Sequence, residues 1–376
     1  MTWCNLYIDG VRNLNHLNID LHNKLTFFTG NNGAGKTSIL EAICLLTTGR
    51  SFKTRNKISA LQHDNEKLHL FAEFKDNQEN IHKLGFGMTQ SGLNTIKYNG
   101  EVLNSLETLS SHYCIKVITP DVFTSITGKV DERRNLLDWQ LFHVEQFFLA
   151  TKKKYTKVLQ HRNALLKEAK LNKQPLHEIR KNIQYWNELL ISLSEKLDNY
   201  RDSTVDTLTF KLNQLLKESN TINNSMLNIY TLSHRYSRGW SKEKRLIDQL
   251  TASLQDDIFK GYTQYGAHKF DFTFFINRKS AAETLSRGEL KTLAVATQIA
   301  QVSIAAQYKN NILVLIDDLF AELDYEHAIW CLQQLWIMPN VQVIVTGIDI
   351  HDAVKDKFSA KDTKWFHVEH GKITQR

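Results

Sequence analysis

The sequence is poor in cysteine and proline and has no long apolar run. Its four cysteines, Cys4, Cys44, Cys114 and Cys331, are scattered without a C-x-x-C pair, which argues against disulfide bonds or structural zinc and favours a reducing compartment. No H-E-x-x-H motif, proline-rich linker or internal repeat is present. No basic-then-apolar leader opens the chain, and no stretch reaches the length of a membrane span. These absences predict a cytoplasmic protein with no membrane partner.

Length and charge set the next limits. The chain has 376 residues, which suggests two or three domains, or one domain with a large insertion. Its formal net charge of +7 favours an acidic partner such as nucleic acid, although a basic surface can also serve solubility alone.

A glycine-rich stretch matches the phosphate-binding pattern G-x-x-x-x-G-K-T. Its residues are Gly30, Asn31, Asn32, Gly33, Ala34, Gly35, Lys36 and Thr37. The flanking residues predict a buried strand over Lys24–Thr29 and a helix over Ser38–Leu46, whose N-terminus would face the phosphates. In this pattern the Lys36 ammonium reaches the outer phosphates and the Thr37 hydroxyl holds Mg²⁺.

Two further motifs can complete such a site. The apolar run Ile312–Ile316 predicts a buried strand, and the two residues after it, Asp317 and Asp318, can serve as metal ligand and as base for the attacking water. Alternatively, they cap the strand end. Leu285–Glu289 precedes a helix, so Ser286 and Gly288 can form a second anion site for a γ-phosphate held by another copy. Alternatively, Ser286 is an ordinary helix cap with Glu289 as its partner.

The middle of the chain is basic and helical. Between Thr151 and Lys173, eight lysines and arginines stand against one acid. This segment is either a contact surface for DNA phosphates or a solvated helix face. The candidate DNA contacts are Lys152, Lys153, Lys154, Lys157 and Arg162. One helix is expected over Trp139–Lys170, and the next carries a heptad seam that slips at Arg201, so we predict a short helical hairpin.

The order of these motifs, followed by Glu322-Leu323-Asp324, resembles an ABC-type ATPase head. Closer matches resemble the RecF family of bacterial recombinational-repair proteins. These matches are Asn32–Thr37 with Leu40-Glu41-Ala42, Gly49–Phe52, Thr119–Asp121, Glu132–Arg134 before Leu137-Asp138, Tyr155 with His161–Lys167, and Gly266–Lys269.

The resemblance implies an ATP-dependent homodimer that binds single-stranded, gapped or junction DNA. It also implies cooperation with RecR and RecO in placing RecA on single strands, and roles at replication forks and in the SOS response. Carried onto this chain, it gives nucleotide and metal contacts to Lys36 and Thr37, and γ-phosphate sensing across the dimer to Ser286 and Gly288. It assigns metal, water and dimer contacts to Asp317, Asp318 and Asp324.

The chain departs from the family and its wider group at three places. Gly266–Asp271 replaces the usual G-P-H-R-D-D, Gly347 occupies the position of the ABC switch histidine, and no Q-loop glutamine is identified near Ile115–Asp121. Because the switch histidine is absent, fast hydrolysis is not expected. With the resemblance, the expected enzyme is a slow, DNA-stimulated ATPase.

The predicted fold is α/β: an ABC-type P-loop ATPase head with a mixed sheet and an inserted helical, short coiled-coil-like lobe. The expected divisions are 1–130 and 261–376 for the ATPase lobe and 131–260 for the insertion. Two rival functions are the nucleotide-binding subunit of a transporter and an SMC-like structural DNA tether. The long separation between Thr37 and Leu285 disfavours the first, and the short heptad segment disfavours the second.

Overall fold

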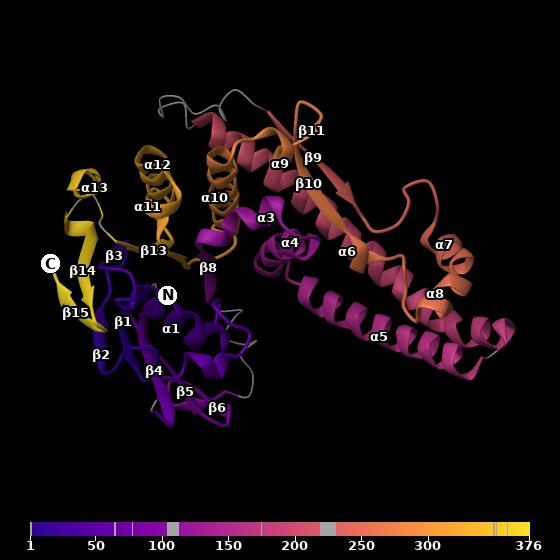
Figure 1. Ribbon diagram of the computed structural model, residues 1–376, viewed down its shortest axis with the longest axis horizontal. Helices are drawn as coiled ribbons and strands as arrows, with labels where there is room; N and C mark the ends of the chain where they lie inside the picture. Colours follow the sequence, from indigo (N-terminus) through magenta and orange to yellow (C-terminus); the bar gives the residue numbers. More distant parts are fainter. Residues whose placement is uncertain are drawn as a thin grey trace. The chain divides into compact units, whose positions relative to one another are not determined.

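The structure, a computed structural model, describes residues 2–63, 65–76, 78–103, 113–173, 175–218, 231–348, 350, 352–358 and 360–376. The chain divides into two units, each described below by itself (Figure 1). The first unit joins Met1–Val122 to Lys291–Arg376, and the second is Phe123–Leu290. In the described residues, no helix is both long and apolar enough to span a bilayer.

The first unit contains a six-stranded sheet that is parallel except for one edge strand, β15 (Lys372–Gln375). Its strands, in spatial order, are β15, β14 (Thr363–Glu369), β3 (Leu25–Thr29), β13 (Val341–Gly347), β12 (Ile312–Ile316) and β8 (Cys114–Ile118). Every residue of β3, β12 and β13 is buried, as expected for parallel strands covered on both faces. The apolar runs in the sequence predicted these central strands, and the structure confirms them.

A second six-stranded sheet, entirely antiparallel, packs in the same unit. Its strands, in spatial order, are β2 (Leu17–Asp20), β1 (Thr2–Asp9), β4 (Lys67–Lys75), β5 (Ile81–Thr89), β6 (Asn94–Tyr98) and β7 (Glu101–Val102). Along β4 the buried and exposed residues alternate, because one face of the sheet lies against the core. The turn at Asn99-Gly100 has positive φ at both residues, which is the geometry predicted for this hairpin.

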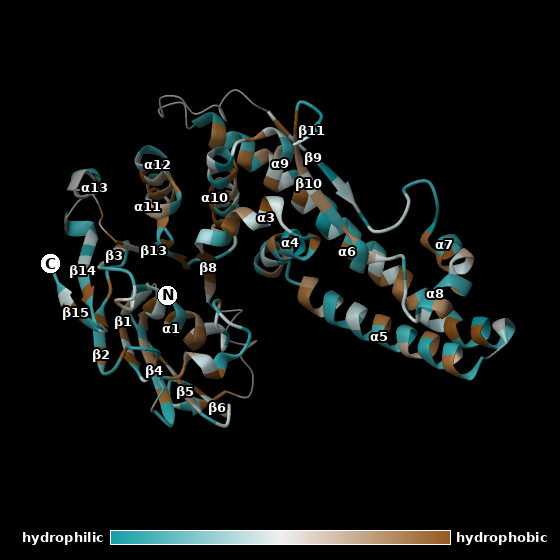
Figure 2. Cartoon of the chain, viewed as in Figure 1, coloured by the Kyte–Doolittle hydropathy of each residue, from teal (hydrophilic) through white to brown (hydrophobic). Residues whose placement is uncertain are grey.

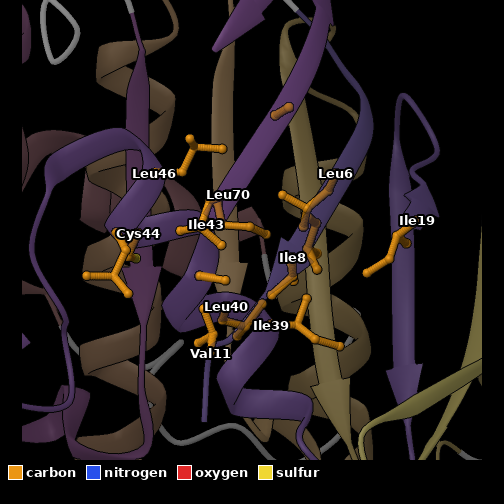
Figure 3. Packing of buried hydrophobic residues seen from close by; sticks show 14 of the residues in the cluster. Leu6, Ile8, Val11, Ile19, Ile39, Leu40, Ile43, Cys44, Leu46 and Leu70 are labelled. Atoms are coloured by element: carbon orange, nitrogen blue, oxygen red, sulfur yellow. The ribbon is translucent and has the colours of Figure 1, made fainter. Parts of the chain in front are cut away.

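Helix α1 (Lys36–Thr48) packs against strands of both sheets. Its Ile39, Leu40 and Ile43 are fully buried in one hydrophobic cluster with Leu6 and Leu70 of the antiparallel sheet (Figure 3). The same cluster includes Leu315 and Ile344 of the parallel sheet. This packing holds α1 rigidly and so fixes the loop that precedes it.

Longer and shorter helices complete the first unit. They are α10 (Arg287–Ala305), which starts in the second unit, α11 (Leu319–Glu322), α12 (Tyr325–Trp336), α13 (Asp352–Lys357), and 3₁₀ turns at Lys57–Ala60, Pro120–Phe123 and Ala360–Asp362. Helix α12 contacts β13, and Gln301 of α10 accepts a hydrogen bond from the buried Lys116 Nζ of β8. Helices therefore contact the parallel sheet at its central and edge strands.

The second unit is built on a long helical hairpin. Its helices are α3 (Thr124–Thr127), α4 (Val130–Val144), α5 (Phe148–Asn172), α6 (Leu176–Glu218), α7 (Leu246–Ala252), α8 (Leu254–Lys260) and α9 (Ala281–Thr284), with a 3₁₀ turn at Ala267–Lys269. Along α5 and α6 hydrophilic and hydrophobic residues alternate, as in an amphipathic pair (Figure 2). A three-stranded antiparallel sheet, β11 (Lys279–Ser280), β10 (Asp271–Ile276) and β9 (Leu232–Ser237), contacts α4 and α6.

The structure corrects two details of the predicted hairpin. The expected continuous helix Trp139–Lys170 breaks at Glu145, whose backbone is extended, and no glycine or proline marks this break. The seam on α6 runs through three buried polar residues, Asn187, Ser194 and Arg201, whereas the predicted apolar neighbours Trp186, Leu193 and Tyr200 are only partly buried. The predicted slip at Arg201 is present, because two spacings of four, Leu197 to Arg201 and Arg201 to Val205, follow one another there.

The unit boundaries differ from the expected divisions at 130, 260 and 261. Residues 261–290 lie in the second unit, because β10 pairs with β9 along its whole length. The sequence did not reveal this pairing, since β9 lies in a segment that was interpreted as helical.

Candidate nucleotide-binding site

The glycine-rich loop joins β3 to α1 and requires glycine at two of its positions. Gly30 has φ of 152°, and a Cβ there would lie 2.1 Å from the Val368 carbonyl oxygen. Gly35 has φ of 117°, and a Cβ there would lie 2.8 Å from Leu14 Cδ2. Side chains other than hydrogen do not fit either position. The loop can therefore curl tightly enough to direct the first N–H groups of α1, which have no carbonyl partner within the helix, toward an anion.

Two residues distant in sequence support this loop. Asn13 Nδ2 donates to the Ala34 carbonyl at 3.1 Å, and the Gly371 N–H donates to the same carbonyl at 2.9 Å. Gly371 has φ of 76°, and a Cβ on it would lie 2.1 Å from the Asn13 carbonyl oxygen. Neither residue belongs to a motif that indicates this role. The one local signal was the His370-Gly371 turn, which predicted a hairpin but not its contact with the loop.

Lys36 is buried at the start of α1, with 4% of its surface exposed. Its Nζ donates to the carbonyls of Gly30 at 2.7 Å and Asn31 at 3.0 Å, so the side chain folds back over the loop. The neighbouring Asn31, Asn32 and Gly33 are exposed. An ammonium in this position can bind phosphate oxygens that lie in the loop.

Asp317 lies directly beside the loop. Its Oδ1 accepts from the Thr37 hydroxyl at 2.9 Å and from the Thr346 hydroxyl at 2.7 Å. The strand order explains this meeting, because β13 lies between β3 and β12 and all three strands are parallel. The end of β13, the residue after β12 and the helix start after β3 therefore bring Thr346, Asp317 and Thr37 together at one edge of the sheet.

Thr346 joins the site although no sequence motif includes it. It is fully buried, and its hydroxyl both donates to Asp317 and accepts from the Asp318 N–H at 3.0 Å. A signal existed in the sequence, since a threonine follows the largely apolar strand Val341–Val345 and precedes Gly347.

Asp318 has the features of a proton acceptor. Its backbone has φ of 50°, an unfavourable region for a residue with a side chain, and such strain is common at functional sites. Burial raises the pKa of its carboxyl, and the charge of Asp317 raises it further, while Lys36 opposes the shift. Among the described residues, Asp318 Oδ1 is buried with no hydrogen-bond partner. This oxygen is therefore available to orient a water molecule.

A buried carboxylate on α1 anchors the segment that follows the helix. Glu41 is fully buried, and Arg12 holds it through two hydrogen bonds of 3.0 Å each. The Ser51 hydroxyl also donates to Glu41, which ties the basic segment Arg50–Lys53 to α1. Two of the matches to the RecF family, at Leu40–Ala42 and Gly49–Phe52, are thus in direct contact.

The residues present fit a nucleotide with Mg²⁺. Thr37 and Asp317 supply adjacent oxygen ligands, and Mg²⁺ in such sites takes its remaining ligands from phosphates and water. In the described residues no cluster of three His, Cys, Asp or Glu side chains could hold a metal alone. A site formed jointly with phosphates needs no such cluster.

The Ser286–Glu289 segment forms the helix cap that was one of its two interpretations. Ser286 Oγ donates to Glu289 Oε2 at 2.6 Å, and the Ser286 N–H donates to the same oxygen at 2.8 Å. Ser286 and Gly288 are exposed, and a Cβ on Gly288 would meet nothing within 4 Å. The cap therefore leaves an open surface at the N-terminus of α10. Asp324 similarly caps α12, accepting from the His327 N–H at 3.0 Å.

The structure separates the candidate DNA contacts into two groups. Lys153, Lys154 and Lys157 are exposed on α5, while Lys152 is half-exposed and pairs with Asp138 at 2.7 Å. Arg162 is different, because it is completely buried. It donates to Asp257, Asn187 and Thr263 at 2.9, 2.8 and 2.6 Å. The expectation that Arg162 contacts DNA is corrected: it is part of the polar core of the second unit.

The altered loop Gly266–Lys269 has a structural role in the same unit. His268 Nδ1 lies 2.7 Å from the Tyr155 hydroxyl, and its Nε2 lies 3.0 Å from the Thr263 carbonyl. Burial lowers the pKa of His268 to about 4. Arg201 donates to the Ala267 carbonyl at 2.6 Å and stacks on Phe270 at 3.6 Å from the ring centroid. The loop therefore links α5 and α6 to the small sheet.

Comparisons with known proteins agree along the whole chain. The profile of the family described as RecF/RecN/SMC N terminal domain matches residues 4–370. The protein named DNA replication and repair protein RecF from Shewanella loihica is 33% identical over 375 residues, covering 100% of this chain and 99% of that protein. Its namesake from Hahella chejuensis is 32% identical over 372 residues, covering 97% and 96%, and that from Stutzerimonas stutzeri 31% over 376 residues, covering 100% and 98%.

Solved structures show the same fold. The recombination mediator protein RecF-ATP in the RecFOR pathway has a TM-score of 0.83 at 22% identity, covering 100% of this chain and 97% of that one. An SMC head bound to the C-winged helix domain of ScpA has a TM-score of 0.59 at 14% identity, covering 100% and 98%. The predicted ATPase head with a helical insertion is confirmed. The chain belongs to the RecF family of DNA replication and repair proteins, within the RecF/RecN/SMC group of ATPases.

Proposed function

We propose that this protein is an ATP-gated dimer that binds DNA in recombinational repair and at replication forks. The observation that carries the proposal is the pairing of Thr37 with Asp317 at 2.9 Å beside the glycine-rich loop. It occurs in a chain that matches RecF relatives over its full length. The loop binds ATP through Lys36 and the first turn of α1, and Thr37 and Asp317 hold Mg²⁺.

Dimerisation follows from the open cap of α10. Ser286 and Gly288 bind the γ-phosphate of ATP held by another copy, so nucleotide joins two protomers. The exposure of both residues supports this role, since neither is covered by the chain itself. Asp324, with 65% of its side chain exposed, contributes to the dimer contact.

Asp318 activates the attacking water, and its raised pKa supports this role. Gly347 offers no side chain where a switch histidine would stand. We therefore expect slow turnover that DNA stimulates, so that the closed dimer persists long enough to act as a switch.

The DNA partner is single-stranded, gapped or junction DNA, contacted in part by Lys153, Lys154 and Lys157. In the cytoplasm, where bacterial DNA lies, the protein works with RecR and RecO to place RecA and so supports the SOS response. The similar solved structures of the recombination mediator RecF, described as part of a RecFOR pathway, support this assignment. A transporter subunit is disfavoured because the match to RecF relatives includes the second unit. A long tether is disfavoured because the 43 residues of α6 span only about 65 Å.

The test mixes two variants that fail for different reasons. Ser286→Arg should bind ATP but block closure, and Lys36→Met should lose a charge-assisted phosphate contact and therefore ATP. Neither should dimerise alone. Together they form one intact composite site, so sedimentation should show partial ATP-dependent dimerisation in the mixture. Ser286→Ala provides a control with no added bulk. Lys36→Met that dimerises with ATP as the wild type does would refute the proposal, as would a Ser286→Arg protein unable to bind ATP.

A further inference from the structure

An exposed aromatic stretch, Phe259–Tyr265, runs alongside the basic segment of α5. Phe259, Tyr262 and Tyr265 lie within seven residues at the end of α8 and beyond, and they are 76%, 45% and 38% exposed. Large aromatic residues are usually buried, so three exposed rings in one short stretch require an explanation.

A shallow groove lies beside the two tyrosines. It has a volume of about 580 Å³ and is lined by Trp240, Tyr262, Tyr265, Ser241, Gln264 and Lys269, together with Ser237 and Gly239. Among the residues that the structure describes, its lining includes one cation and no carboxylate. The groove therefore offers flat rings, hydrogen-bonding groups and a positive charge.

The two loops that line the groove contact each other through the backbones of Gly239 and Gly266. The Gly266 N–H donates to the Gly239 carbonyl at 3.2 Å, and a Cβ on Gly239 would lie 2.3 Å from the Gly266 oxygen. Because the backbones touch, the rings on the two loops are fixed relative to one another. A binding surface of this kind needs little ordering when a ligand arrives.

Cations accompany the rings. Lys269 Nζ lies 5.4 Å from the Tyr262 centroid, and the Arg238 guanidinium lies 4.7 Å from that of Trp240. Lys170, in the basic segment of α5, lies 5.6 Å from the Phe259 centroid. A Cβ on Gly261 would lie 3.3 Å from Lys167 Cγ, so that segment runs alongside the aromatic stretch. Aromatic rings interleaved with cations suit a chain that alternates flat bases with phosphates.

We propose that this groove binds unpaired bases of single-stranded DNA by stacking on Tyr262 and Tyr265. Lys269 and Lys170 neutralise the adjoining phosphates. The absence of acids in the lining favours a polyanion over a protein partner of ordinary charge. The inference rests on the proposed function and deepens it, because it assigns the single-stranded part of a gapped substrate to one surface.

The test measures binding of the intact chain with ATP to an oligothymidylate of about twenty nucleotides and to a duplex of the same length. The double variant Tyr262→Leu with Tyr265→Leu should bind the oligothymidylate at least about tenfold more weakly, since each stacked base contributes a several-fold gain. Its duplex affinity and its salt slope should be unchanged, because no phosphate contact is lost. Lys269→Gln should instead reduce the slope of the single-strand affinity by about 0.7.

Controls separate stacking from loss of fold. Tyr262→Phe with Tyr265→Phe keeps both rings and should retain affinity, and Phe210→Leu removes an aromatic residue that is 74% exposed on α6. The stacking site is overturned if the leucine pair binds the oligothymidylate like the wild type, or loses duplex affinity equally. A wild-type protein that binds duplex but not the oligothymidylate overturns the site alone. Failure to bind either DNA overturns the proposed function as well.

Discussion

Replacing Thr346 by valine tests the central arrangement of the nucleotide site. Valine keeps the shape of the side chain but removes the hydroxyl that donates to Asp317 at 2.7 Å and accepts from the Asp318 N–H at 3.0 Å. A hydrogen bond to a charged group contributes about 1.5–3 kcal/mol, and an unsatisfied buried N–H costs about 1–3 kcal/mol. Since the two losses share one atom and do not add fully, we expect Thr346→Val to lower the free energy of unfolding by about 2–4 kcal/mol.

The same change should affect metal binding. Without Thr346, Asp317 keeps the Thr37 contact but loses the restraint from the other side. We therefore expect Thr346→Val to require more Mg²⁺ for the same ATP binding. Urea unfolding gives the stability, and ATP titrations at several Mg²⁺ concentrations give the metal requirement. Thr346→Ser keeps the hydroxyl and serves as the matched control. Equal stability and equal Mg²⁺ requirement in the valine and serine variants would refute this account.

Three other predictions concern the support of the glycine-rich loop, the exposed lysines of α5 and His268. Gly371→Ala should weaken ATP binding, measured by titration, because its Cβ would lie 2.1 Å from the Asn13 carbonyl and displace the loop support; unchanged affinity would show that the support is dispensable. Lys153→Glu with Lys154→Glu should lower DNA affinity broadly across sequences and flatten its salt dependence, and an unchanged slope would leave this face of α5 merely solvated. The pKa of His268 is lowered to about 4 from an ordinary 6.5, so the unfolded chain binds a proton at His268 more readily than the folded protein does. The free energy of unfolding should therefore be unaffected by His268 above pH 6.5 and should fall by up to roughly 3 kcal/mol as the pH decreases toward 4. Urea unfolding across this pH range should show a shallower pH dependence for His268→Asn, and an identical dependence would contradict the assignment.

Local sequence signals predicted the central strands and the glycine-rich loop of the first unit well. The run Ile312–Ile316 matches β12 at both ends, because a fully apolar five-residue stretch has few other places in a folded chain. The glycine-rich loop was predictable because its conformation is imposed by its own residues. Asp317 could be placed beside the loop because it follows a parallel strand, and the structure confirms that proximity.

Features that depend on distant partners were not predictable in this way. Asn13 and Thr346 are ordinary residues in local sequence and acquire their roles only when β13 and the chain ends come together. Arg162 carried the signature of a surface contact, since lysines surround it, yet Asp257 lies 95 positions away and draws it into the core. Spacing rules also assume that the buried positions of a helix are apolar, so they do not predict the burial of Asn187.

The buried Arg162 has a consequence for how the helical hairpin can move. Its Nε donates to Asn187 of α6. Its Nη1 donates to Asp257 of α8 and to Thr263, which follows α8. Two helices with a purely apolar seam can slide by one heptad at small cost, since leucine replaces leucine. Here such a slip would separate the guanidinium from Asn187 and Asp257 and leave buried charges unpaired, which costs about 3–5 kcal/mol. The hairpin therefore has a single alignment, and any signal it transmits must pass as a rigid tilt rather than as a sliding change of register.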